Sequence, residues 1–234
     1  MSGVMPNQWD ELAESLEAFG IGRNEASARY LRRSFFQVKD LWSKQHNAIL
    51  AMGKIRLVMF GEAPLYGKKE SYFYNAAAGA TEFFTYKDAE AIVGPLLYSS
   101  RVQKNGTRPR KEEMLKSLAK AGVLVVDLMP FALNQFDTVV TYSSIRKESS
   151  YLNIFDKCWD PYLLPMLKLV LEHTTPETKF VFRYQVLRNL FERRLIDELG
   201  KLGRAVDTIP SIHESRSVNR SELLRIWISS AQHV

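Results

Sequence analysis

Several features that common protein functions require are scarce or absent in this sequence. Cys158 is the only cysteine, which excludes an internal disulfide, a cysteine-rich zinc site and an iron–sulfur cluster held by four thiolates. No stretch approaches the roughly 20 apolar residues of a membrane-spanning helix, and residues 1–10 lack the basic and then apolar pattern of a signal peptide. Neither standard Gly-rich phosphate loop occurs. We therefore expect a soluble, cytoplasmic protein that uses no metal or organic cofactor and does not bind membranes.

The residues that are present suffice for one ordinary core. The chain has 234 residues, of which 46% are hydrophobic, and this size favours one domain over two. The sequence predicts a single domain over residues 1–234, in which residues 1–52 form an N-terminal helical extension. We expect a monomer.

Short apolar runs alternate with longer helical patterns along most of the chain. Because strands separated by helices pair in parallel through right-handed crossovers, this alternation predicts an α/β fold, with a central four-stranded parallel sheet and helices on both faces. The predicted strands span residues 56–60, 123–128, 179–184 and, more weakly, 205–209. The predicted helices span residues 8–19, 24–52, 88–98, 111–121, 159–172, 187–202 and 221–231.

Positive charge is concentrated in residues 101–120. This segment contains seven Lys or Arg and only two Glu, so it carries most of the formal net charge of +6. Such a run is typical of a solvated helix face. Gly106 and Pro109 predict a loop in its first half, which favours the alternative that the segment is an arm following a polyanion such as DNA.

Polar and aromatic side chains follow three of the predicted strands. The first strand runs into residues 61–64 (Gly-Glu-Ala-Pro) and then an aromatic cluster at 72–74 (Tyr-Phe-Tyr), the second ends near Asp127, and the fourth is followed by residues 213–216 (His-Glu-Ser-Arg). The carboxyl ends of parallel strands meet at one edge of the sheet, where ligands of open α/β proteins bind. The sequence therefore predicts a site for a planar ligand at this edge.

Residues 61–64 resemble the first active-site motif of the uracil-DNA glycosylase superfamily, in the Gly-Glu-Ala-Pro form of its iron–sulfur-containing branch. The resemblance extends over about residues 55–220 in the order of elements, and the first motif is its sharpest part. It implies a three-layer sandwich around a parallel sheet. It also implies a base excision repair enzyme that binds single- or double-stranded DNA and hydrolyses the N-glycosidic bond of a flipped, damaged base.

The resemblance also implies roles for individual residues. Glu62 matches the acidic residue that acts on water and the sugar, and His213 matches the histidine that stabilises the leaving base. Phe73 or Tyr72 matches the aromatic that stacks on the base, and Asp127 falls where the residue that reads the base edge is expected. The base-binding set is completed by Tyr66, and the residues expected to hold DNA phosphates are Arg108, Arg110, Lys111, Arg216 and Arg220.

The chain departs from the family pattern at several positions. Ala63 stands where the best-known branches carry an Asp or Asn that activates water, and the cysteines of an iron–sulfur cluster are absent. Asp127 replaces an Asn. Because an ionised carboxylate only accepts hydrogen bonds whereas an amide both donates and accepts, Asp127 favours a base with an amino group over uracil.

Two other functions remain open at this point. The departures at Ala63 and Asp127 would suit a non-catalytic nucleic-acid-binding module of the same fold. A small-molecule hydrolase or nucleotide-binding protein on a similar sheet is the third interpretation. Each candidate residue also has a structural interpretation: Glu62 and Asp127 as residues that cap turns, the 72–74 cluster as a loop folded on the core, and His213 as a packed histidine.

Overall fold

The structure is a computed structural model that describes residues 7–17, 24–63, 72–77, 108–131 and 149–212. Helices and strands alternate through most of these residues. In chain order the elements are α1 (Asn7–Glu17), α2 (Glu25–Met52), β1 (Leu57–Gly61), α4 (Arg108–Lys120), β2 (Val123–Asp127), α6 (Ser149–Cys158), a π-helical turn η1 (Trp159–Leu163), α7 (Leu164–Leu171), β3 (Lys179–Phe182) and α8 (Gln185–Lys201).

The three strands form one parallel sheet in the order β2-β1-β3. All five residues of β1 and of β2 are buried, as expected of apolar runs covered on both faces. The mixed α/β class and the parallel pairing predicted from the sequence are thus confirmed. The predicted strand bounds agree with the observed ones to within two residues.

The predicted fourth strand is wrong. Residues 205–209 form no strand, and among the described residues the only pairing on that side is a bridge between Phe182 and Ser211, where Phe182 N–H donates to Pro210 O (2.7 Å). One carboxylate oxygen of Glu192 on α8, Oε1, accepts hydrogen bonds from the Ile209 N–H and the Thr208 hydroxyl, each at 2.9 Å. These bonds draw the segment toward the helix, so its backbone does not follow β3.

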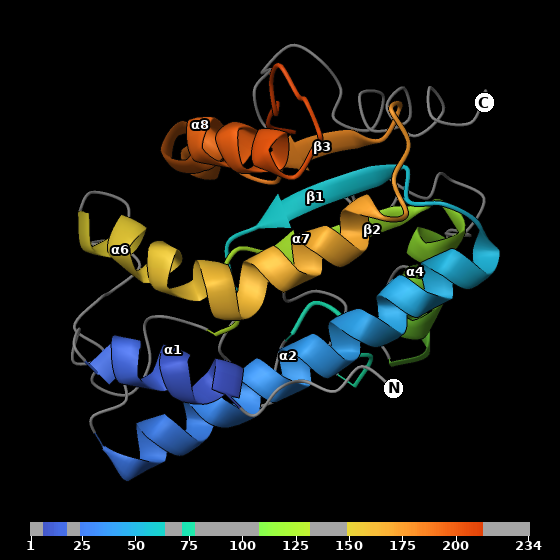
Figure 1. The fold of residues 1–234 in the computed structure, drawn as a ribbon. Coiled ribbons are helices and arrows are strands. Elements are labelled where there is room, and N and C mark those ends of the chain that lie inside the picture. The colour runs from blue at the N-terminus through green and yellow to red at the C-terminus, as the bar shows by residue number, and fades with distance from the viewer. Residues whose placement is uncertain (1–6, 18–23, 64–71, 78–107, 132–148, 213–234) are drawn as a thin grey trace.

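Helices pack around the sheet on several sides. Figure 1 shows α8 beside β3, and α7, α2 and α1 stacked on the other side of β1. The buried side chains of α1 and α2 belong to the same hydrophobic cluster as the strands, and Phe35 of α2 contacts Tyr162 of η1 at 6.1 Å between ring centroids. The N-terminal helices therefore share the core of the sheet.

Two helices start at least three residues earlier than the sequence predicts. The helix predicted over 159–172 begins at Ser149 and continues through Pro161 by widening to the π-helical turn η1. The predicted loop at 108–110 is instead the first turn of α4. Proline is well tolerated there because the first turn of a helix needs no N–H donor. The helices predicted at 88–98 and 221–231 lie outside the described residues.

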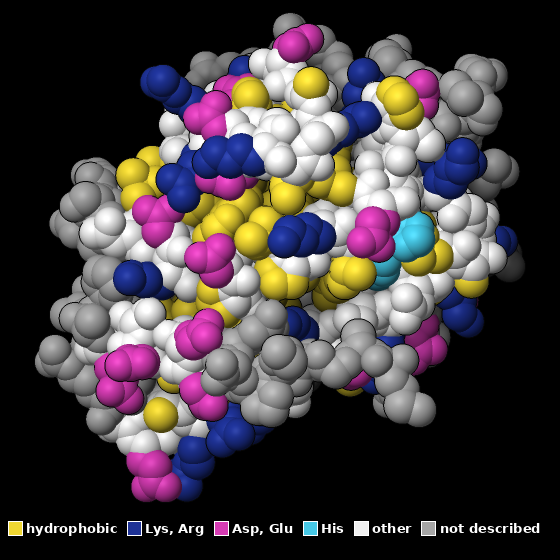
Figure 2. All heavy atoms as spheres, viewed as in Figure 1, with side chains coloured by type: hydrophobic (Ala, Val, Ile, Leu, Met, Phe, Trp, Pro, Cys, Tyr) yellow, Lys and Arg dark blue, Asp and Glu magenta, His cyan; other side chains and the backbone are white. Residues whose placement is uncertain are grey.

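The surface carries both signs of charge. Figure 2 shows Lys and Arg interspersed with Asp and Glu, and hydrophobic side chains gathered between α8 and the α6–α7 run. Leu152 of α6 and Val186 of α8 are among the exposed large hydrophobic residues. Within the described ranges no helix has the length and apolar character needed to cross a membrane.

A side chain satisfies part of the outer edge of β2. The Tyr74 hydroxyl accepts a hydrogen bond from Val125 N–H and donates one to Val125 O at 3.0 Å. The N–H and C=O of Val125 face away from β1, so no strand among the described residues satisfies them. Tyr74 thus takes the place of a neighbouring strand at this position and ties the aromatic segment to the sheet.

We predict that Tyr74→Phe lowers the free energy of unfolding by about 1–3 kcal/mol, because it leaves buried backbone groups of Val125 without a partner. Tyr162→Phe is the matched control. Tyr162 is also buried, but its hydroxyl has no hydrogen-bond partner among the described residues, so its loss should be neutral or stabilising. Urea unfolding of both variants tests this, and equal losses of stability would contradict it.

Candidate functional site

Three charged side chains leave adjacent strands at the carboxyl edge of the sheet. Glu62 follows β1, Asp127 ends β2 and Arg183 follows β3. Backbone hydrogen bonds fix these ends relative to each other: Leu128 N–H donates to Gly61 O (3.0 Å), and Arg183 N–H donates to Phe60 O (3.0 Å). These backbone hydrogen bonds hold the strand ends that carry Glu62 and Asp127 side by side, as the sequence predicts, and place Arg183 at the same edge.

Gly61 leaves the space that the carboxylate of Asp127 occupies. The two residues are direct partners in the β1–β2 register, so their Cβ positions lie on the same face of the sheet. A Cβ added at Gly61 would overlap Asp127 Oδ1. Arg183 follows Phe182, whose register partner on β1 is Phe60. Arg183 therefore lies next to Gly61 on the β3 side of the central strand. Asp127 and Arg183 thus flank a central position without a side chain.

The carboxyl group of Asp127 is held in an unusual electrostatic state. It is 8% exposed, and its Oδ1 has no hydrogen-bond partner in the part of the chain that the structure describes. Burial raises the pKa of Asp127 to about 7, with the charge of Arg183 acting to lower it and that of Glu62 to raise it. This carboxyl group therefore titrates near neutral pH.

Two tyrosine hydroxyls lie close enough to Asp127 to feel its charge. Burial, and secondarily the charge of Asp127, raises the pKa of Tyr162 well above its usual value. Burial also raises the pKa of Tyr74, where Asp127 adds a smaller contribution. Both hydroxyls stay protonated near neutral pH, so the surroundings of Asp127 contain hydrogen-bond donors as well as charges.

Of the expected stacking residues, Tyr72 and Phe73 are described and both are buried, at 3% and 2% exposure. The ring of Phe73 meets that of Tyr74 edge to face, with centroids 4.7 Å apart. The loop is therefore packed against β2, and neither ring presents an open face in this conformation.

The placement of Lys111 corrects its expected role as a phosphate ligand. Lys111 is 2% exposed, and its Nζ donates to Tyr72 O at 3.1 Å. Its ammonium group is directed inward because the packed aromatic segment supplies this hydrogen-bond acceptor. Lys111 ties α4 to the aromatic segment and is not available to a phosphate on the surface.

The remaining predicted site residues are only partly described or lie outside the described residues. The backbones of Arg108 and Arg110 lie in the first turn of α4, without described side chains. Tyr66, His213, Arg216 and Arg220 lie outside the described ranges. Their assignments remain predictions.

Sequence reasoning overlooked Arg183 and Tyr162. Arg183 carried a usable signal, since it is the first polar residue after the apolar run 180–182, the same pattern that singled out Asp127. Tyr162 carried none, because it reaches the site only through the π-helical turn η1. Turns of this kind are frequent at functional sites.

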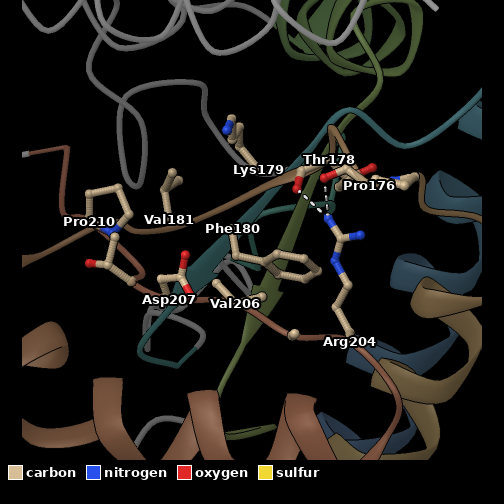
Figure 3. Close-up of a pocket in the computed structure, with 11 residues that line it drawn as sticks. Pro176, Thr178, Lys179, Phe180, Val181, Arg204, Val206, Asp207 and Pro210 are labelled. Atoms are coloured by element: carbon tan, nitrogen blue, oxygen red, sulfur yellow. Dashed lines mark hydrogen bonds between the residues drawn. The ribbon is translucent and has the colours of Figure 1, made fainter.

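A pocket of about 340 Å³ lies elsewhere, between the amino-terminal half of β3 and residues 204–210. Figure 3 shows the Phe180 ring inside it, and the Arg204 guanidinium donating to the carbonyls of Pro176 (2.7 Å) and Thr178 (3.0 Å). Residues 205–208, from the segment predicted as the fourth strand, line part of it. Since none of its lining residues follows a strand end at the carboxyl edge, it is separate from the Asp127 site.

Comparison of the chain with protein-family models, with curated proteins and with solved structures found no match in any of the three. The assignment of the site therefore depends on the chemistry of its own residues.

The raised pKa of Asp127 makes stability depend on pH. Between about pH 4 and pH 7 the unfolded chain has released this proton while the folded chain retains it, so the free energy of unfolding should fall as pH rises through this range, by up to about 4 kcal/mol, and level off above it. Asp127→Asn should remove this decline, whereas the exposed Asp160→Asn should keep it. Urea unfolding at pH 5, 6, 7 and 8 measures it. A wild-type profile unchanged by Asp127→Asn would show that Asp127 is ionised throughout.

Proposed function

We propose that this protein binds DNA and hydrolyses the N-glycosidic bond of a base flipped out of the stack. The observation that supports this most is the buried Asp127 carboxyl group, whose Oδ1 has no partner among the described residues and whose pKa responds to the charges of Arg183 and Glu62. A buried polar atom that no protein group satisfies is expected where a ligand supplies the partner. Strongly shifted pKa values are enriched at such sites.

The proposed chemistry assigns separate tasks to Glu62 and to the basic residues Arg183 and His213. When the bond between C1′ and the base nitrogen breaks, its electron pair stays on the base and positive charge develops on the sugar. Glu62 is only half buried, so it can face the sugar, stabilise this charge and orient the water whose oxygen bonds to C1′. The water's proton passes to Glu62 or to solvent. Arg183, together with His213, is assigned to the negative charge on the leaving base.

Asp127 is assigned to the edge of the base. In its ionised form the carboxylate only accepts hydrogen bonds and suits an exocyclic amino group. In its protonated form the carboxyl group can donate as well as accept, as an amide does, and it then tolerates a carbonyl such as that of uracil. Because the pKa of Asp127 is raised to about 7, both forms are accessible near neutral pH.

The proposed fold is a three-layer sandwich of the uracil-DNA glycosylase type. It is supported by the parallel strand order β2-β1-β3 and by the segment at Ser211, which bridges to β3 where a fourth strand would lie. A non-catalytic nucleic-acid-binding module is the second candidate. It is favoured by the burial of Tyr72 and Phe73, since a stacking role requires this loop to open.

Glu62→Gln separates the enzyme from the binding module. We predict that it keeps DNA affinity but lowers base release by at least about 100-fold, because it removes the charge while nearly preserving volume. The exposed Glu113→Gln, on α4, should leave both properties unchanged. The assay measures alkali-labile abasic sites in oligonucleotides that carry different damaged bases. If Glu62→Gln still releases the base, Glu62 has no part in the mechanism. If the wild-type protein releases no base, the binding module is favoured.

Substrate preference should depend on pH through Asp127. Raising the pH from 6 to 8 should shift base release away from uracil and toward a base with an exocyclic amino group, as the carboxyl group loses its proton. Asp127→Asn should prefer uracil at both pH values. The measurement is the ratio of release rates from two oligonucleotides that differ only in the base. If the ratio is the same in both proteins at both pH values, Asp127 does not read the base.

A further inference from the structure

Two histidines meet at the opposite edge of the sheet from Asp127. His46 lies on α2, and His173 follows the end of α7. Their ring centroids are 5.5 Å apart, with a tilt of 54° between the ring planes. The His173 carbonyl accepts a hydrogen bond from Ile55 N–H just before β1 begins, at 3.4 Å. The pair therefore joins α2 and α7 at the amino-terminal end of the central strand.

The spacing of the two rings suits a shared metal ion. A ring nitrogen lies roughly 1.1 Å from its centroid and a zinc–nitrogen bond adds about 2.0–2.1 Å, so two imidazoles on one ion have centroids about 4.5–6 Å apart. The observed 5.5 Å lies within this range. A hydrogen bond between the rings would satisfy only one nitrogen of each.

His46 has a nitrogen that no described group satisfies. The residue is 5% exposed, and its Nε2 has no hydrogen-bond partner in the described part of the chain. The indole of Trp42 stacks on the imidazole of His46, with ring centroids 5.0 Å apart and an angle of 8° between the ring planes.

His173 connects the pair to solvent. It is exposed and lines a pocket of about 200 Å³ together with Glu172, Lys54 and Thr174. In Figure 2 imidazole atoms reach the surface next to an acidic side chain. An ion with bound water therefore has a route to the two rings.

We propose that His46 and His173 form a binding site for a divalent transition metal ion, of the zinc or copper class. Imidazole nitrogens are preferred ligands of these ions. In the described residues no third His, Cys, Asp or Glu completes a group with them, so the other coordination positions are taken by water. By joining α2 to the segment between α7 and β3, the ion stabilises the fold. The site is separate from Asp127 and independent of the proposed reaction.

The test uses the full chain and Cu²⁺ or Zn²⁺ alone as the probe. Cu²⁺ should quench tryptophan fluorescence saturably, because Trp42 stacks on a ligand ring, and the electron paramagnetic resonance spectrum of bound Cu²⁺ should show coupling to two nitrogens. His173→Gln changes an exposed side chain and should weaken binding more than about ten-fold. Zn²⁺ should raise the melting temperature of the wild type and not that of His173→Gln.

Two control variants identify the site. His233→Gln, at a histidine far away in sequence, should bind Cu²⁺ as the wild type does. Trp42→Phe should keep the affinity, measured calorimetrically, and lose most of the quenching. The proposal is overturned if wild-type binding is absent, or if His173→Gln binds as tightly as the wild type with the same two-nitrogen spectrum. Because His173 is exposed, the outcome does not depend on whether a His46 variant folds.

Discussion

The arrangement at the carboxyl edge depends on the missing side chain of Gly61. Gly61 is the last residue of the central strand, and its register partner Asp127 places a carboxyl group where any Cβ would lie. Arg183 lies beyond it on the other neighbouring strand. With a larger residue at position 61, Asp127 would have to turn away and the two charges would be separated. One glycine thus allows opposite charges from the two outer strands to share one face of the sheet.

The cost of this arrangement is the burial of ionisable groups. Asp127 lies in surroundings that include the Tyr74 and Tyr162 hydroxyls and the charge of Glu62, and its pKa rises to about 7. A protein selected for stability alone would replace such a carboxyl group with an apolar residue, since unsatisfied buried polar atoms destabilise the fold. The presence of this group at the end of a strand that is otherwise apolar fits a site that uses charge.

The two ends of the central strand carry different chemistry. Beside its carboxyl end lies Asp127, whose pKa burial raises to about 7, whereas its amino end has a pair of imidazoles beside Trp42. Between these ends, the outer edge of β3 is left partly open, because Glu192 draws residues 208–209 toward α8 and a pocket forms instead of a fourth strand. The anchoring of Tyr74 on β2 closes part of the opposite edge. The two outer edges of the sheet thus differ: a tyrosine hydroxyl satisfies part of β2, and a pocket lies beside β3.

Sequence alone was sufficient for the features that depend on local pattern. Continuous apolar runs identified β1, β2 and β3, helical spacing identified the main helices, and the rule that parallel strands end at one edge placed Glu62 beside Asp127. It was insufficient where a side chain from a distant segment decides the outcome. Residues 205–209 have the composition of a strand, yet the carboxylate of Glu192 takes the hydrogen bond that a strand would need.

The same distinction applies to the site. A basic residue such as Lys111 is ordinarily placed on the surface, and only packing against Tyr72 directs its ammonium group inward. The proximity of Arg183 to Asp127, of Tyr162 to the same carboxyl group and of His46 to His173 depends on strand order and helix packing, which join residues far apart in the chain. Sequence by itself determined which residue types end each strand, because that is written in local order. The tertiary structure decided which of them face one another and how deeply they are buried, since burial and neighbouring charge set the protonation state on which their chemistry depends.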